Sequence, residues 1–134
     1  MKHEQIRAQW RRASRSLGAA EILLREEFWD DAVSRAYYAV MHAAKAALLL
    51  HDAVPKSHSA VRRLFGGLLV HTGEIEDEWA EILAHEQTQR AVADYLADTE
   101  PTAEEAREMV RDADRFVKRM GEYLTSNDVD LENE

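Results

Sequence analysis

AVSRAYYAVMHAAKAALLL, residues 32–50, is an almost wholly apolar stretch in which the strongly polar side chains recur at a regular interval. These side chains are Arg35, Tyr38, His42 and Lys45, at spacings of three, four and three residues. On an α-helix they form one stripe, and apolar residues cover the rest of the helix. Because an unpaired buried charge is costly, this polar stripe must face water, a charged partner or a second subunit.

The segments around this stretch are also helical by their apolar spacing, and none alternates as a strand does. The expected helices cover about residues 4–27, the quoted stretch as far as His51, the region from Ser57 toward Gly73, residues 75–97 and residues 102–124. The sequence therefore predicts an all-α fold, an antiparallel up-and-down bundle of four to five helices. The helix at 32–50 should be its central member or lie at a dimer seam.

Several helix ends carry recognisable signals. Asp30 and Asp31 are expected to supply the N-cap and a favourable negative charge for the second helix, and Ser57 to cap the third. Thr102 and Glu105 have the spacing of a capping box. The apolar pattern becomes irregular at 87–88, which indicates a kink or break there.

Composition sets the class of protein. The 134 residues fit one domain, expected at 1–125, followed by a disordered acidic tail at 126–134. There is no cysteine, which excludes disulfides and cysteine zinc sites, and no apolar segment long enough for a membrane span, so a soluble cytoplasmic protein is expected. The net charge of −9 argues against a protein that coats nucleic acid without sequence preference, because such proteins are normally basic. The first seventeen residues nevertheless carry five Lys and Arg against one acid.

Other charged residues have structural and functional interpretations. Lys56 and His58 flank Ser57 at a helix start, where backbone N–H groups can hold phosphate, but capping alone explains Ser57. Arg90 and Asp94 have the spacing of an i,i+4 ion pair. A stripe formed by the arginines at 7, 11 and 15 is interpreted as a solvated face, and the histidine spacing predicts no metal site.

Four segments together carry a family resemblance: DDAVSRAYYAVMHAAKAALL at 30–49, VPKSHSAVRRLF at 54–65, RAVADYL at 90–96 and TAEEAREMVRDADRFVKRM at 102–120. In this order they resemble the HEPN family (higher eukaryotes and prokaryotes nucleotide-binding), in its small stand-alone branch. The resemblance runs from about residue 10 to residue 122. It implies a helical bundle that forms a homodimer, with no cofactor. It also implies a metal-independent endoribonuclease, the toxin of a pair with a minimal nucleotidyltransferase antitoxin.

The family's catalytic signature is an arginine, four to six residues and a histidine, and Arg35 and His42 match it with six residues between them. In dimeric members two copies of this pair line one cleft. A neutral imidazole can take the proton of an RNA 2′-hydroxyl while a guanidinium stabilises charge on the attacked phosphate, leaving a 2′,3′-cyclic phosphate and a 5′-hydroxyl. Tyr38, Lys45, Lys56 and His58 are further candidates for substrate contact.

The chain departs from the family pattern at two positions. Ala36 stands directly after the arginine, where active nucleases usually have a polar residue. Ala44 stands two residues after the histidine, where one toxin subgroup has a tyrosine that the antitoxin adenylylates, so that regulation is not carried over.

Three alternatives to catalysis stay open. Arg35 and His42 can belong to a solvated stripe, with Arg35 paired to an acid of a neighbouring helix. The domain can be a non-catalytic HEPN module that binds a nucleotide or a protein partner. The residues at 42–45 are also similar to the His-x-x-Lys of histidine phosphotransfer domains, which usually have glycine next, whereas this chain has Ala46.

Overall fold

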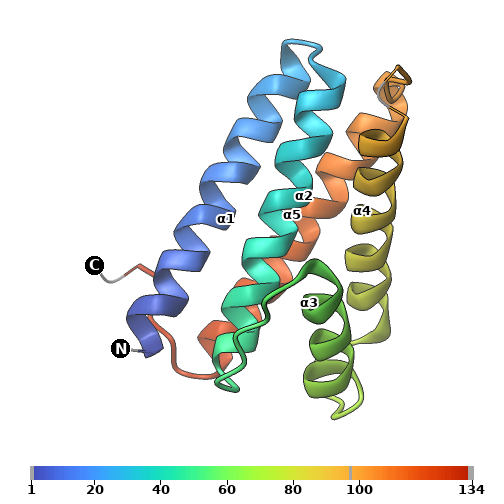
Figure 1. The fold of residues 1–134 in the computed structure, drawn as a ribbon. Coiled ribbons are helices and arrows are strands. Elements are labelled where there is room, and N and C mark those ends of the chain that lie inside the picture. Colours follow the sequence, from blue (N-terminus) through green and yellow to red (C-terminus); the bar gives the residue numbers. More distant parts are fainter. Residues whose placement is uncertain (1, 97, 133–134) are drawn as a thin grey trace.

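The computed structural model describes residues 2–96 and 98–132, and every regular element in these ranges is helical. The long helices are α1 (Lys2–Arg25), α2 (Trp29–Leu49), α4 (Asp77–Tyr95) and α5 (Ala103–Ser126). The short α3 (His58–Phe65) continues into a π-helical turn, η1 (Gly66–Val70). The long helices run alternately up and down, which confirms the predicted all-α bundle (Figure 1).

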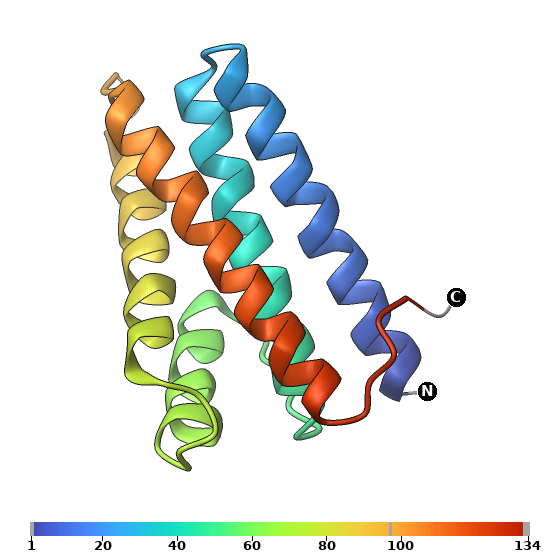
Figure 2. The same cartoon turned by 180° about the vertical axis from the view of Figure 1, so that it is seen from behind.

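α2 is the central helix, as its apolar composition predicts. It packs against α1, α3, α4 and α5, and Figure 2 shows it between α1 and α5 from behind. Small side chains allow this close approach, because alanine adds little bulk between helix axes. Seven of its alanines are buried: Ala32, Ala36, Ala39, Ala43, Ala44, Ala46 and Ala47.

Two of the predicted caps are confirmed and one is wrong. Thr102 and Glu105 form both hydrogen bonds of a capping box, and Ser57 accepts from the N–H of Ala60 at 3.1 Å. Asp30 and Asp31, however, lie inside the first turn of α2, which begins at Trp29 without a capping side chain. Their negative charge still favours this end of the helix.

α4 and the C-terminal segment also differ from the sequence prediction. α4 runs without a break through 87–88, and its predicted end at residue 97 lies outside the described residues. Beyond α5, Val129 is only 2% exposed and packs in a cluster with Ile6 and Leu124. The described part of the segment 126–134 is therefore attached to the bundle, whereas its composition predicts disorder; residues 133 and 134 lie outside the described range.

Acidic side chains gather where α4 and α5 meet. Glu78 and Glu81 of α4 and Glu108 and Asp112 of α5 line one shallow surface, which we call the acidic face. Arg115 lies among them and contacts Glu78 at 3.4 Å and Asp112 at 3.5 Å. One arginine against four acids leaves this face negative.

None of the helices within 2–96 and 98–132 has the length and hydropathy of a membrane-spanning helix.

α1 and α5 pack closely where Trp10 lies over Gly121. A Cβ added at Gly121 would stand 2.7 Å from the ring of Trp10, inside van der Waals contact. We expect Gly121→Ala to lower the free energy of unfolding by about 1–3 kcal/mol, because the indole has to move out of a packed position. Urea denaturation measures this change.

The matched control for Gly121→Ala is Gly18→Ala, because a Cβ at Gly18 meets nothing within 4 Å. Gly18 lies in the interior of α1, so alanine there should be neutral or stabilising by up to about 1 kcal/mol. Equal stability changes in the two variants would show that Trp10 does not restrict the packing of α5.

Candidate functional site

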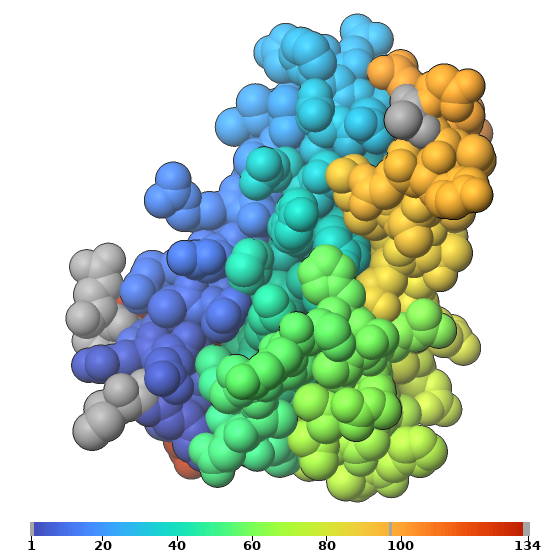
Figure 3. Space-filling view, in the orientation of Figure 1, coloured from blue at the N-terminus to red at the C-terminus, as the bar shows by residue number. Residues whose placement is uncertain are grey.

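The polar stripe of α2 reaches the surface between α1 and α3. Arg35 and Tyr38 are exposed and His42 and Lys45 are half-buried, while the residues on the other sides of α2 are buried. Figure 3 shows α2 as a strip that separates α1 from α3 and α4. The sequence prediction that this stripe is left uncovered within the chain is confirmed.

Arg35 and His42 lie in one shallow groove between α1 and α2. We call it the arginine groove because α1 adds Arg12 and Arg15 to it. Its lining consists of Arg12, Arg15, Ser16, Ala19, Arg35 and His42. Within the described ranges no ion pair involves any of these three arginines, so the groove presents uncompensated positive charge in a protein of net charge −9.

The imidazole of His42 is held by one hydrogen bond from α1. Its Nδ1 lies 2.7 Å from Oε1 of Gln9, and an amide oxygen only accepts, so Nδ1 carries the proton. The neutral ring then has its lone pair on Nε2, for which the described residues provide no partner. Burial first, and then the charges of Lys45 and Arg12, lower the pKa of His42 below its ordinary 6.5. At neutral pH His42 is therefore an unprotonated base.

The guanidinium of Arg35 lies over the ring of Tyr38, 5.8 Å from its centroid. This contact orients the side chain without neutralising it. Pairing with an acid of a neighbouring helix is the structural alternative for Arg35, and no such pair is present in residues 2–96 and 98–132. Arg35 thus keeps its full charge for an anion that enters the groove.

The two departures from the family signature point away from the arginine groove. Ala36 and Ala44 are both fully buried in the main hydrophobic core. The position directly after Arg35 therefore faces the interior of the bundle, and alanine there removes no polar group from the groove in this chain.

Sequence reasoning missed the contribution of α1. Gln9, Arg12 and Ser16 are spaced by three and four residues and so share one helix face, which is the available signal. The predicted stripe at 7, 11 and 15 instead joins residues of which only Arg15 lines the groove. Which face of α1 meets α2 depends on how the helices pack, and the periodicity of α1 alone does not specify it.

The remaining candidates are distributed differently. Lys45 does not line the arginine groove, although its charge acts on His42. Tyr38 and His58 line a separate, larger cavity beside it, and Lys56 is exposed and lines neither. Arg90 and Asp94 form the predicted ion pair at 2.7 Å, which is confirmed.

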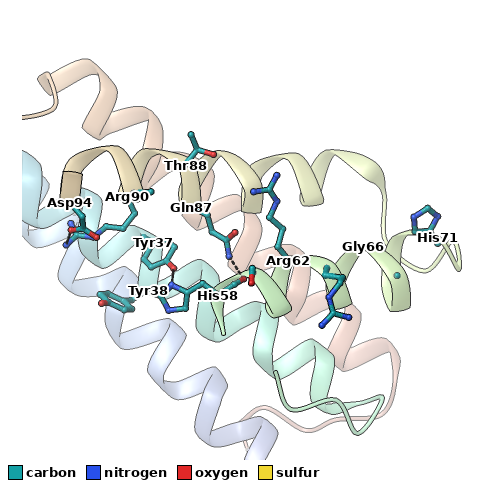
Figure 4. A pocket seen from close by; sticks show the side chains of 14 residues that line it. Tyr37, Tyr38, His58, Arg62, Gly66, His71, Gln87, Thr88, Arg90 and Asp94 are labelled. Carbon is teal, nitrogen blue, oxygen red and sulfur yellow. Dashed lines mark hydrogen bonds and ion pairs between the residues drawn. The ribbon is translucent and has the colours of Figure 1, made fainter. Parts of the chain in front are cut away.

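The larger cavity measures about 900 Å³ and lies between α2, α3 and α4 (Figure 4). We call it the tyrosine cavity, after Tyr37 and Tyr38 on its α2 wall. The Tyr37 hydroxyl and His58 Nδ1 share a hydrogen bond, and Gln87 donates to the His58 carbonyl at 2.8 Å. Burial, followed by the charge of Tyr38, raises the pKa of Tyr37 to about 12, so this hydroxyl stays protonated.

Comparisons with known proteins agree on one family. The family model of the HEPN domain matches residues 6–123. Two proteins of Methanocaldococcus jannaschii, named "Putative toxin MJ0605" and "Putative toxin MJ0142", are 40% and 36% identical to this chain. The first match covers 90% of each chain, and the second covers 88% of this chain and 80% of the other. The "UPF0332 protein glr0978" of Gloeobacter violaceus is 35% identical, over 84% of this chain and 90% of its own.

Proposed function

Since the chain belongs to the HEPN family, we propose that it is a toxin-like endoribonuclease that cleaves RNA in the arginine groove without a metal ion. One observation carries this proposal: His42, with its free Nε2, lies in the same groove as three arginines that have no acidic partner among the described residues. Cleavage of RNA by attack of the 2′-hydroxyl on phosphorus requires a general base and positive charge beside the phosphate, and the groove contains both. The names of the two Methanocaldococcus relatives support the toxin-like role.

In the proposed reaction the scissile phosphate lies among Arg12, Arg15 and Arg35. Nε2 of His42 takes the proton of the adjacent 2′-hydroxyl, and the 2′-oxygen forms a bond to phosphorus. The bond from phosphorus to the 5′-oxygen breaks, and this oxygen leaves after taking a proton from an imidazolium. The products are a 2′,3′-cyclic phosphate and a 5′-hydroxyl, and the arginines stabilise the charge that accumulates on the phosphate oxygens.

We also propose that two copies of the chain associate through α2, and that a minimal nucleotidyltransferase is the antitoxin. The uncovered polar stripe supports the dimer, because a second copy would add another His42 and Arg35 to the same cleft. This second His42, in its protonated imidazolium form, supplies the proton for the leaving oxygen. Sedimentation of the purified protein measures the association.

The experiment that tests the proposed reaction compares two substrates in EDTA. One is an end-labelled structured RNA, and the other carries 2′-deoxynucleotides at the positions that are cut. We expect cleavage of the first, with products ending in 2′,3′-cyclic phosphate, and none of the second, because it lacks the attacking oxygen. Equal cleavage of both would refute attack by the 2′-hydroxyl, and cleavage of neither would leave the groove as a binding surface.

A further inference from the structure

The tyrosine cavity takes no part in the proposed chemistry, yet its lining is charged and aromatic. Arg62 and Arg63 of α3 line it, and the described residues contain no ion pair for either. Arg90 and Asp94, also in the lining, neutralise each other. The cavity therefore carries an excess of positive charge on its α3 wall.

Tyr38 joins the tyrosine cavity to the arginine groove. Its ring lines the cavity, is 38% exposed and supports the Arg35 guanidinium. The same ring meets Tyr37 edge to face, with the centroids 5.3 Å apart, which helps to hold it in place. A ligand that extends from the groove into the cavity would pass this aromatic side chain.

Most polar side chains of the cavity are already engaged. The Tyr37 hydroxyl bonds to His58, the Gln87 amide to the His58 carbonyl and the Thr88 hydroxyl to the carbonyl of Ala84. The features left for a ligand therefore include the exposed ring of Tyr38 and the guanidinium groups of Arg62 and Arg63. A flat π-system attached to an anion matches this combination.

The π-helical turn contributes two glycines to the lining of the cavity. Gly66 and Gly67 begin this turn and line the cavity, and a Cβ built at either meets nothing within 4 Å. π-helical turns are rare and occur frequently at functional sites. A side chain introduced at Gly67 would consequently begin in open space.

We propose that the tyrosine cavity binds the nucleotide next to the scissile one in single-stranded RNA. Its base stacks on Tyr38, and neighbouring phosphates contact Arg62 and Arg63. Stacking on an aromatic ring beside a basic surface is the usual basis of single-strand binding. The inference rests on the proposed function, since the groove supplies the scissile phosphate, and it predicts that a strand able to splay out a base binds better than a duplex.

The test measures binding without cleavage, with a fully 2′-O-methylated single-stranded oligonucleotide as the probe. We expect Arg62→Ala/Arg63→Ala to weaken binding and to reduce the slope of log affinity against log salt by about 1.4, since each single-strand phosphate contact contributes about 0.7. Gly67→Trp, which introduces a large side chain in the lining of the cavity, should weaken binding about tenfold through lost stacking. The control is Arg107→Ala/Arg111→Ala on α5, where neither residue lines the groove or the cavity, and its affinity should stay unchanged.

Wild-type affinity and salt slope in both cavity variants would overturn the proposal, as would equal affinity for the duplex form of the probe. If a mononucleotide bound as tightly as the oligonucleotide probe, the cavity would be assigned to a free nucleotide and the proposed RNA subsite would be overturned. RNA cleavage is measured separately on the same proteins. Binding that depends on the cavity in a protein that cuts no RNA refutes the proposed reaction alone, and cleavage with unaltered binding in the variants refutes the subsite alone.

Discussion

Replacing His42 by alanine is expected to reduce the rate of RNA cleavage by about 10²–10⁴-fold, the usual contribution of a positioned general base. The imidazole is half-buried at the surface and is linked to α1 by the hydrogen bond to Gln9, so the bundle should remain folded without it. Single-turnover cleavage of a labelled RNA measures the rate, and circular dichroism and sedimentation check folding and association. His85→Ala is the control, because His85 is exposed on α4 and lines neither the groove nor the tyrosine cavity.

Arg35→Ala should reduce the rate of RNA cleavage by about 10²–10³-fold, which is the usual effect of removing one group that stabilises transition-state charge. Arg107→Ala is its matched control, since Arg107 also lies over an aromatic ring, 5.6 Å from the centroid of Trp29, but outside the groove. Full activity in Arg35→Ala and His42→Ala would refute the catalytic assignment and place RNA cleavage at another site.

The pH dependence of cleavage follows from the environment of His42. In the proposed reaction one His42 acts as the unprotonated base and a second, protonated His42 as the acid, and burial with the nearby Lys45 and Arg12 lowers the pKa of His42 below 6.5. The rate of the two-histidine reaction should therefore be greatest at a pH below 6.5 and fall on both sides, at lower pH because the base is protonated and at higher pH because the acid has lost its proton.

The second large effect concerns Glu86 of α4, whose side chain is fully buried. Neither of its carboxyl oxygens has a hydrogen-bond partner among residues 2–96 and 98–132. Burial first, and then the charge of Asp112, raise the pKa of Glu86 well above its ordinary 4.5, so the folded protein holds it protonated. We expect Glu86→Leu to raise the free energy of unfolding at pH 7 by about 1–3 kcal/mol, because it removes an unsatisfied buried polar group.

The gain from Glu86→Leu should depend on pH with a definite sign. A carboxyl whose pKa is higher in the folded than in the unfolded state favours folding most at a pH below 4.5, and this contribution is lost as the pH rises toward the folded pKa. The advantage of the variant should thus grow from pH 4 to pH 7 in urea denaturation. Glu81→Leu, at an exposed acid of the same helix, should change stability by less than about 0.5 kcal/mol. A variant less stable than wild type at pH 7 would show that Glu86 has a stabilising partner.

Residue spacing within single helices predicts the features that depend on one helix alone. The apolar sides of α2 and α5, the caps at Ser57 and Thr102 and the exposed stripe with Arg35 and His42 all follow from residue spacing. The start of α2 was misplaced because acids favour both the cap and the first turn of a helix, so composition alone does not separate the two positions.

Features that depend on two helices were not predictable in the same way. Gln9 and Arg12 reach His42 only because of the direction in which α1 packs on α2. Glu86 reads as one acid in a charged segment, but it follows Trp79 and Leu83 at spacings of four and three and so shares their buried face. Val129 is anchored by Ile6 from the other end of the chain, a contact that no local pattern records.

The acidic face of α4 and α5 has a consequence for how RNA would meet this protein. Folded RNA greatly outnumbers any one target in a cell, and most collisions are with the wrong molecule or the wrong side. Four carboxylates compensated by a single arginine repel a polyanion there, while the arginine groove attracts it. Unproductive encounters would be brief and the molecule would rotate toward its RNA, so that discrimination begins before any base is read.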